Sequence, residues 1–455
     1  MPLQSINPTT GKLIQSYPEM TGKTLPGILQ KTQNAFESWR WSEFPERSRK
    51  MKKAAEILRA RKEDLASLMA QEMGKPVTQG RAEIEKCAFA CDYFAEGARR
   101  FLADETIPTE AARSFVTFQP LGVVLAIMPW NFPFWQVFRF AAPALMAGNA
   151  AILKHASNVT GCALTIEKIF QEAGFPSDLF RSLVLGSDQV GRIIDHPVIK
   201  AVTLTGSTRA GKEVASRAGR ALKKTVLELG GSDPYLIFPD ADLKAAVEQC
   251  VSSRLVNSGQ SCIAAKRFIV PKAIQKQVEE LFVTVMKSKR MGDPLKETTQ
   301  VGPLAREDLR RELHGQVARS IKKGARLLLG GEIPGTPGAF YPPTVLSHVQ
   351  KGMPAYEEEI FGPVAAIIPV KDEEEALKVA NDSSFGLGAA IFTKDLKRAE
   401  ELASRHLEAG LCFVNAFVRS DPRLPFGGIK ESGYGRELSD FGIREFVNVK
   451  TVWVA

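Results

Sequence analysis

Cysteine and histidine are scarce in this sequence, and neither forms a metal-binding or disulfide pattern. The 455 residues include six cysteines and five histidines, with no CxxC pair and no clustered histidines. Cys87 and Cys91 are four residues apart in a predicted helix, but no histidine lies near them in the sequence. So few cysteines in so long a chain argue against a disulfide framework and a zinc site. We therefore expect no metal.

Long apolar runs are also missing. The longest run, Leu121–Met128, is far shorter than the roughly 20 residues that a membrane-spanning helix needs. The first residues lack the basic segment and apolar core of a secretory signal peptide. We therefore expect no membrane partner, and the cytoplasm is the expected location.

Charge of one sign is not concentrated anywhere in the chain. The formal net charge is +9, but the lysines and arginines are scattered among glutamates and aspartates. No sustained basic tract or aromatic–basic motif of a nucleic-acid-binding protein is present, so no nucleic-acid partner is expected. A modest positive field would instead attract anionic small molecules, such as a phosphorylated cofactor or a carboxylate substrate.

The residues that are present have the composition of a globular protein. Apolar residues make up 44% and charged residues 24%, and the length predicts two or three structural units. Helical spacing of apolar residues predicts long helices over Pro45–Met73, ending at Gly74, and over Ala82–Phe101. The first hundred residues are thus expected to be largely helical.

From Val123 onward, short apolar strands alternate with helices. The alternation restarts after Gly231, where a helix over Asp240–Asn257 is expected with Asp240 as its N-cap. Such alternation predicts an α/β fold with parallel sheets and helices on both faces.

Three segments supply the groups that acyl chemistry on a carbonyl requires. Cys262 follows Asn257-Ser258-Gly259-Gln260-Ser261, Glu228 precedes Leu229-Gly230-Gly231, and Asn131 lies in Trp130-Asn131-Phe132-Pro133. They offer a thiol nucleophile, a carboxylate base and an amide donor for an oxyanion. A fourth segment, Thr205 to Gly211, follows an apolar strand and opens a helix, where a dinucleotide pyrophosphate would bind, although its spacing is not GxGxxG.

Together these segments resemble the aldehyde dehydrogenase superfamily, and the resemblance covers nearly the whole chain. It implies two Rossmann-type parallel-sheet domains and a small β oligomerisation flap. The dinucleotide-binding domain would comprise residues 1–108 and 122–230, the catalytic domain 231–435, and the flap 109–121 and 436–455. Pairing through the flap would give a homodimer or homotetramer.

The resemblance also implies roles for the three chemical groups. Cys262 would attack the aldehyde, Asn131 and the backbone N–H of Cys262 would hold the oxyanion, and Glu228 would activate the water that cleaves the thioester. Relatives that transfer the acyl group to coenzyme A generally lack a Glu at the position of Glu228. A hydrolytic dehydrogenase is therefore expected.

The cofactor residues carried over from the family favour NADP, with NAD as a weaker alternative. Lys154 would reach the adenosine ribose, and Ser157 stands where many NAD-using members have a Glu that would repel a 2′-phosphate. His155 departs from the family's usual Pro. The remaining cofactor contacts are expected from Pro129, Trp130, Gly206, Ser207, Leu229, Glu359 and Phe361.

Two residues resemble the substrate contacts of the succinate-semialdehyde dehydrogenase subfamily. Arg139 stands in an apolar helix and requires an anionic partner, which is either the substrate carboxylate or an internal Asp or Glu. Ser420 matches a substrate-binding Ser. A second Arg of many members is Val256 here, so no nearby residue is an obvious substitute for the charge of Arg139. Ala264 replaces a second Cys, so no redox switch is expected.

The expected activity is thus NADP-dependent oxidation of succinate semialdehyde to succinate. A dehydrogenase of another small or ω-carboxylated aldehyde, such as glutarate semialdehyde, is the alternative within enzymes. A cysteine hydrolase is a further alternative, but the absence of a His near Cys262 in the sequence and the presence of the cofactor loop argue against it. A protein that keeps the fold without activity would not need the complete Cys, Glu and Asn set.

Overall fold

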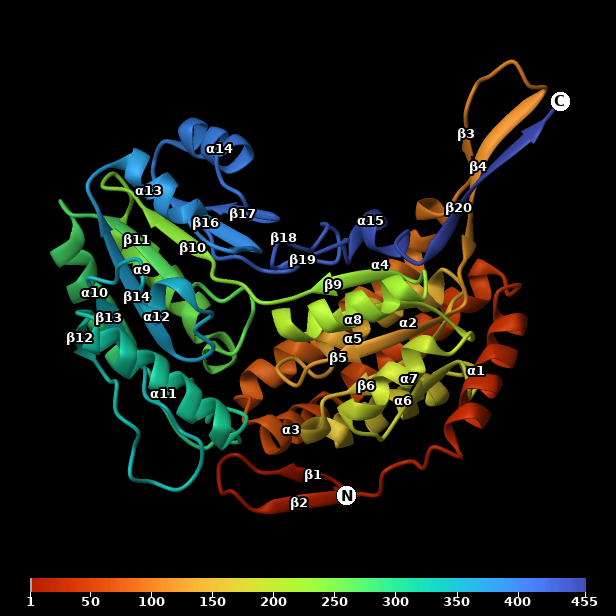
Figure 1. Ribbon diagram of the computed structural model, residues 1–455, viewed down its shortest axis with the longest axis horizontal. Helices are drawn as coiled ribbons and strands as arrows, with labels where there is room; N and C mark the ends of the chain where they lie inside the picture. Colours follow the sequence, from red (N-terminus) through yellow and green to blue (C-terminus); the bar gives the residue numbers. More distant parts are fainter. Residues whose placement is uncertain (1) are drawn as a thin grey trace.

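The computed structural model describes residues 2–455 as two lobes, each built on an open sheet, with a small third sheet that projects from one lobe (Figure 1). Met1, the first residue of the predicted dinucleotide-binding domain, lies outside the described residues. None of the helices in residues 2–455 combines the length and the apolar character needed to cross a membrane.

The first sheet has six strands in the order β19-β9-β8-β5-β6-β7, and all neighbours are parallel except β19 and β9. Its strands are β5 (Val123–Met128), β6 (Ala150–His155), β7 (Phe180–Ser182), β8 (Ile199–Thr205), β9 (Lys224–Glu228) and β19 (Gly433–Tyr434). The helices of this lobe are α1 (Leu25–Trp39), α2 (Phe44–Ala60), α3 (Lys62–Met73), α4 (Val77–Phe101), α5 (Trp135–Met146), α6 (Thr160–Glu172), α7 (Val190–Asp195), α8 (Thr208–Arg220) and α15 (Ser439–Ile443). Short 3₁₀ turns η1 (Ser157–Val159) and η2 (Ser187–Gln189) precede α6 and α7.

The second sheet has seven strands in the order β12-β13-β14-β11-β10-β16-β17, and only the β12–β13 pair is antiparallel. Its strands are β10 (Pro234–Ile237), β11 (Arg267–Pro271), β12 (Arg326–Leu329), β13 (Thr344–Ser347), β14 (Val364–Val370), β16 (Gly388–Phe392) and β17 (Leu411–Val414). Its helices are α9 (Leu243–Leu255), η3 (Val256–Gly259), α10 (Gln275–Lys287), α11 (Glu307–Lys322), α12 (Pro354–Glu357), α13 (Glu373–Asn381) and α14 (Leu396–Arg405). The predicted α/β class with two parallel sheets is confirmed.

The third sheet is antiparallel and carries the end of the chain away from the body (Figure 1). It pairs β20 (Val447–Val454) with β4 (Arg113–Pro120), and β4 with β3 (Glu105–Thr106). Two short pairs, β1 (Leu3–Ile6) with β2 (Leu13–Tyr17) and β15 (Phe385–Gly386) with β18 (Ile429–Lys430), complete the strands. The β1–β2 hairpin was not predicted, since its strands are short and mostly exposed.

Apolar side chains bury both faces of the second sheet and join the two lobes. Along β10, Tyr235 and Ile237 belong to the larger core cluster, which also contains the first sheet, whereas Leu236 belongs to a second cluster. This alternation follows from the period of two along a strand. The continuous core fixes the relative position of the lobes and therefore of the loops between them.

Two predicted helices differ from the structure. The predicted helix Pro45–Met73 is broken at Arg61 into α2 and α3, although it does end at Gly74, which adopts φ +78°. Asp242, not Asp240, caps α9, because its carboxylate accepts from Ala245 N at 3.1 Å. Asp240 is engaged elsewhere, by the Thr393 hydroxyl and the Lys394 backbone N–H.

Candidate active site

Loops at the carboxyl ends of the first sheet face a loop of the second lobe. Strands β5, β8 and β9 end at Met128, Thr205 and Glu228, and parallel strands share one edge where their carboxyl ends meet. Two cavities, of about 460 Å³ and 280 Å³, lie between these loops and the segment around Cys262. Among the described residues, Cys262 is the one residue that lines both cavities.

The larger cavity contains most of the residues predicted to bind the cofactor. Ser207 is the N-cap of α8 and accepts from Ala210 N at 3.3 Å, so the free N–H groups of a helix start open onto the cavity. Trp130 and Phe361 meet edge to face, with ring centroids 5.8 Å apart. The predicted cofactor residues in its lining are Pro129, Trp130, Gly206, Ser207, Leu229, Glu359 and Phe361.

The glycine pair after Glu228 lets the second lobe approach closely. A Cβ at Gly230 would lie 2.6 Å from Glu359 Oε2, and one at Gly231 would lie 2.6 Å from the Cys262 carbonyl oxygen. The Glu359 carboxylate accepts from Gly231 N at 2.9 Å and lies 3.7 Å from Lys266 Nζ. Burial raises the pKa of Glu359, and Lys266 partly opposes this. Glu359 is therefore held inside the site rather than on a solvated face.

The structure does not bring Lys154 and Ser157 into this cavity. Lys154 is buried at the end of β6, and burial lowers the pKa of its ammonium. Ser157 is exposed and lines a separate depression that also contains Arg306 and Arg311. Both residues nevertheless follow the same edge of the first sheet as the other cofactor residues.

His155, the departure from the family pattern, braces the loop that carries Asn131. Its Nδ1 accepts from Ala156 N at 2.9 Å, so Nε2 carries the proton and donates to the Pro133 carbonyl at 2.9 Å. Burial lowers the pKa of His155 to about 4. The ring is therefore neutral at physiological pH.

The nucleophile loop is held by a buried lysine. Lys266 Nζ donates to the carbonyls of Ser261, Cys262 and Ala264 at 3.0, 2.7 and 3.2 Å. Burial raises the pKa of the Cys262 thiol to about 12, while Arg139 and Lys266 act in the opposite direction. The thiol therefore keeps its proton at neutral pH until a base accepts it.

The turn before Cys262 is backbone-strained and joined to the Asn131 loop. Asn257 and Ser258 adopt φ of 51° and 56°, a region that costs non-glycine residues energy and recurs at functional sites. Asn257 Nδ2 donates to the carbonyls of Asn131 and Gln260 at 2.6 and 3.1 Å. Sequence reasoning gave Asn257 no role.

Asn131 points toward the nucleophile loop. Its Nδ2 donates to the Gln260 carbonyl at 3.2 Å, and its side chain is buried. An amide nitrogen has two N–H groups, so one remains for a carbonyl oxygen near Cys262.

Glu228 is a buried carboxylate without a hydrogen-bond partner for either oxygen among the described residues. Burial raises its pKa well above the ordinary value, and the nearby Arg139 opposes this only in part. Gly427 leaves room for it, since a Cβ there would lie 2.8 Å from Glu228 Oε1. A buried polar group without a partner indicates a site that a ligand or water completes.

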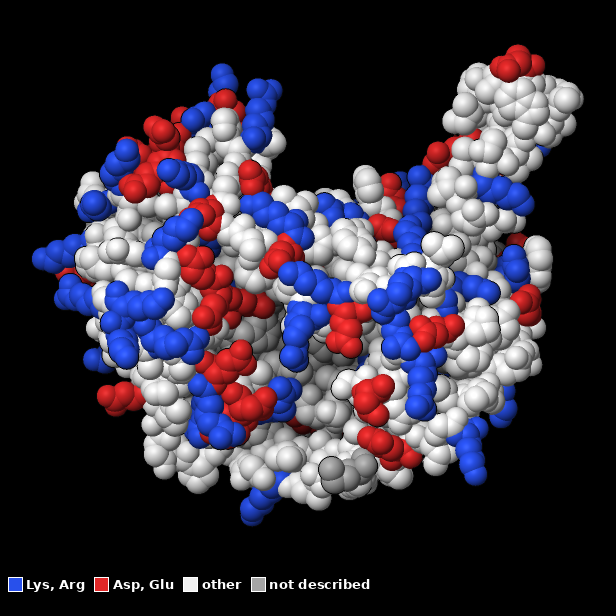
Figure 2. Space-filling model, in the orientation of Figure 1, with Lys and Arg blue, Asp and Glu red and all other residues white. Residues whose placement is uncertain are grey.

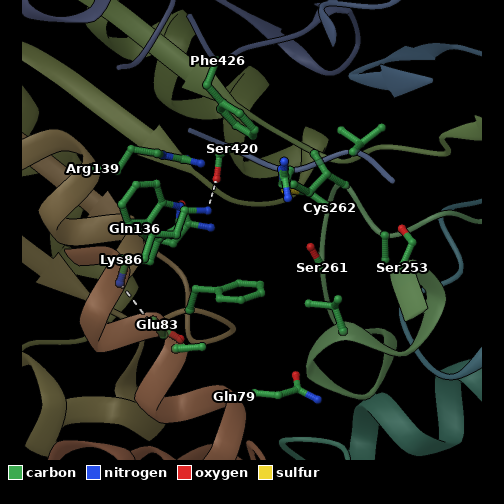
Figure 3. Close-up of a pocket in the computed structure, with 18 of the residues that line it drawn as sticks. Gln79, Glu83, Lys86, Gln136, Arg139, Ser253, Ser261, Cys262, Ser420 and Phe426 are labelled. Atoms are coloured by element: carbon green, nitrogen blue, oxygen red, sulfur yellow. Dashed lines mark hydrogen bonds between the residues drawn. The ribbon is translucent and has the colours of Figure 1, made fainter. Parts of the chain in front are cut away.

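The smaller cavity is the candidate substrate pocket, with Arg139 and Ser420 in its wall (Figure 3). Arg139 is not free, because it forms a buried ion pair with Glu437, donates to Thr205 Oγ1 at 3.2 Å and stacks on Phe426. The structure thus gives Arg139 the internal partner that the sequence left open. Val256 lines the same pocket.

Lys86 is a cation in this pocket that sequence reasoning missed. Its Nζ donates to Ser420 Oγ at 2.6 Å (Figure 3). It also lies 4.3 Å from the centre of the Trp135 ring. The sequence offered no obvious substitute for the charge of Arg139, and Lys86 lies in the wall of the same pocket. In the sequence, Lys86 is one of several charges on a helix, and its contact with Ser420 spans 334 positions.

Another buried carboxylate, Glu83, fixes the start of α5. It accepts from the backbone N–H groups of Phe134 and Trp135 at 3.0 and 2.9 Å and forms an ion pair with Lys75. These bonds satisfy free N–H groups of a helix N-terminus. They hold in place the helix that presents Arg139.

Known proteins with the same arrangement are numerous. A probable succinate-semialdehyde dehydrogenase [NADP(+)] of Synechocystis sp. is 48% identical, with the whole of both chains covered. The succinate semialdehyde dehydrogenase [NAD(P)+] Sad of Escherichia coli K12 is 48% identical over 99% of this chain and 97% of its own. The crystal structure of succinic semialdehyde dehydrogenase from Streptococcus pyogenes in complex with NADP+ superposes with a TM-score of 0.97, at 38% identity and 99% coverage of each chain.

The family model agrees with these relatives. The model described as "Aldehyde dehydrogenase family" matches residues 1–452. With this match and relatives near half identity along the full length, the chain belongs to the aldehyde dehydrogenase family.

Proposed function

We propose that this protein oxidises succinate semialdehyde to succinate with NADP as the hydride acceptor. The observation that carries the proposal is that, within residues 2–455, Cys262 alone lines both a cofactor-sized cavity and a smaller pocket with cationic side chains. The names of the relatives from Synechocystis and Escherichia coli agree with this substrate.

In the proposed reaction, the Cys262 thiol gives its proton to water, the thiolate sulfur adds to the aldehyde carbon, and the carbonyl oxygen becomes an oxyanion. The free N–H of Asn131 and the backbone N–H of Cys262 would stabilise that charge. A nicotinamide held beside Trp130 and Phe361 would supply the hydride acceptor, and loss of hydride from the former aldehyde carbon would leave an acyl thioester on Cys262. Glu228 then takes a proton from water, the hydroxyl oxygen bonds to the acyl carbon, and the C–S bond breaks to release succinate.

The chemistry of the residues fits a dinucleotide. The helix start at Ser207 offers N–H groups to a pyrophosphate, and Glu359 offers a carboxylate to ribose hydroxyls. Trp130 and Phe361 form an aromatic wall near Cys262. Lys154 and Ser157 would accept a 2′-phosphate, because neither adds a negative charge.

We further propose that the chain acts in the cytoplasm as a homodimer or homotetramer that pairs through the projecting third sheet. Its strand β20 exposes Val449, Trp453 and Val454. In Figure 2 this sheet is mostly uncharged, while charges of both signs are interspersed over the body. Apolar residues exposed on a projecting strand favour a protein partner.

The test is to mix the purified protein with NADP and succinate semialdehyde and to follow absorbance of the reduced nicotinamide. Butanal, glutarate semialdehyde and NAD serve as comparison substrates. We expect the highest kcat/KM with succinate semialdehyde and NADP. Cys262→Ala should abolish turnover but still bind NADP. A higher efficiency with butanal, or turnover by Cys262→Ala near the native rate, would refute the proposal.

A further inference from the structure

The ionic groups around the smaller cavity cancel in pairs except at two cations, Lys86 and the exposed Arg419. Arg139 is neutralised by Glu437, and Glu83 by Lys75, and all four side chains are buried. Lys86 has no carboxylate within ion-pair distance in the described part of the chain, residues 2–455. The pocket therefore has an uncompensated positive charge at Lys86.

The surroundings of Lys86 contain few groups that could neutralise it. Glu83 and Cys87 lie on its own helix, Arg139 faces it from α5, and Asp421 follows Ser420. Asp421 is already engaged, since Arg423 donates to its carboxylate at 2.7 and 2.9 Å. Burial lowers the pKa of Lys86 to about 8, and the repulsion from Arg139 adds to this effect.

The hydrogen bonding of Lys86 is also incomplete. An ammonium has three N–H groups, and Lys86 donates one of them, to Ser420. Ser420 is buried and accepts this bond, which leaves its own hydroxyl proton free to donate. The two side chains therefore present neighbouring donors to the pocket, and a carboxylate has two oxygens that would accept them.

We propose that Lys86 is the cation that recognises the distal carboxylate of the aldehyde substrate, with Ser420 as a second donor beside it. Arg139 then serves mainly as the fixed partner of Glu437 and as a positive charge near Glu228. This inference rests on the proposed function, because it assigns the specificity of that reaction to a residue on α4. Lys86 supplies the pocket with a positive charge, which the uncharged Val256 does not.

The test compares succinate semialdehyde with butanal, which has the same chain length and no carboxylate. Lys86→Met should raise KM for succinate semialdehyde by about tenfold to a hundredfold, the range for losing a charge-assisted bond. Its kcat/KM with butanal should stay within about threefold of the native value. Lys86→Gln keeps a donor for Ser420 and should show the same selective rise in KM. It serves as the test variant if Lys86→Met does not fold. Lys86→Arg should retain part of the affinity.

Lys53→Met is the matched control, since Lys53 is an exposed lysine of the neighbouring α2, paired with Glu56. It should leave both substrates unaffected. If Lys86→Met and Lys86→Gln keep the native selectivity for succinate semialdehyde over butanal, the proposed role of Lys86 is refuted. The proposed function would then still stand. If the native protein itself does not favour succinate semialdehyde, the proposed function and this inference fail together.

Discussion

Glu228 illustrates how a single buried residue is given an unusual protonation state. Its carboxylate lies near a cation, Arg139, but Glu437 already neutralises that cation, so burial dominates and raises the pKa of Glu228. A carboxylate with a raised pKa is a stronger base once it is ionised. The same burial should make the folded protein less stable at pH values where an unfolded chain would ionise this group.

Glu228→Gln tests both consequences. The folded protein holds the Glu228 proton that the unfolded chain releases above its ordinary pKa, so stability falls as pH rises above that value. Glutamine removes this cost. The variant should therefore melt at a higher temperature than the native protein at pH 8, with a gap that shrinks toward pH 5, and thioester hydrolysis should slow. Thermal melting at pH 5, 6.5 and 8 measures this; a gap that does not change with pH would contradict it.

Ser157 is the residue on which cofactor choice should depend. Ser157→Glu would put a carboxylate against the 2′-phosphate of NADP and offer a hydroxyl acceptor to NAD. Like charges at a desolvated site cost several kcal/mol, so the ratio of NADP to NAD efficiency should fall by at least about tenfold. Ser157→Ala is the control and should change the ratio little. An unchanged ratio in Ser157→Glu would mean that the phosphate is bound elsewhere, for instance near Arg306 or Arg311 in the depression that Ser157 lines.

At the scale of elements, the short segment from η3 to β11 matters most for the site, because it carries Cys262. It leaves α9 through the left-handed turn at Asn257 and Ser258 and returns to the sheet at Arg267. Lys266 cross-links this segment through three carbonyls and lies beside Glu359 in the cofactor cavity. The position of the Cys262 sulfur is thus coupled to Glu359, the residue proposed to bind the cofactor ribose.

Lys266→Met should disturb this loop without touching substrate. We expect kcat to fall by about tenfold or more, while KM for succinate semialdehyde changes less. Since Lys266 lowers the pKa of Cys262, its removal should also shift the pH dependence of iodoacetamide alkylation of Cys262 upward. Lys272→Met, an exposed lysine on the same stretch, is the control. Equal alkylation profiles in both variants would leave Lys266 with a packing role only.

Elements were easier to predict from the sequence than their interruptions and contacts. The parallel strands were recognisable because buried strands are continuous apolar runs between glycine-rich turns. The break at Arg61 was not, since apolar spacing continues through α2 and α3. The candidate trio of Cys262, Glu228 and Asn131 could be proposed from local motifs, whereas Lys86 and the partner of Arg139 depend on contacts across about 300 residues, which periodicity does not reveal.

At the scale of the whole molecule, the site belongs to neither lobe alone. Asn131 and Glu228 come from the first sheet, and Cys262 and Glu359 from the second lobe. The third sheet lies apart from this site and projects from the body (Figure 1). In the proposed function, chemistry and assembly therefore lie on different surfaces.

Substitutions on β20 should therefore affect assembly. Val449 and Trp453 are 61% and 50% exposed on this strand, and lysine at both positions would oppose pairing through an apolar surface. The double variant Val449→Lys, Trp453→Lys should show a smaller mass by light scattering than the native protein. Leu222→Lys, at a 96% exposed leucine on the body, is the control. An unchanged mass in the double variant would place the interface elsewhere.

The antiparallel pairing of β19 with β9 has a consequence for biosynthesis. Gly433 pairs with Glu228 itself, and Tyr434 with Leu227, so the strand that ends in the proposed general base gains its second neighbour from residues some 200 positions later. While a ribosome is still making the second lobe, the outer edge of β9 has no neighbouring strand, so its backbone groups are free to pair. The nascent first lobe would thus present a site for wrong pairing until almost the whole chain has emerged, and a chaperone that shields β9 should raise the yield of active protein.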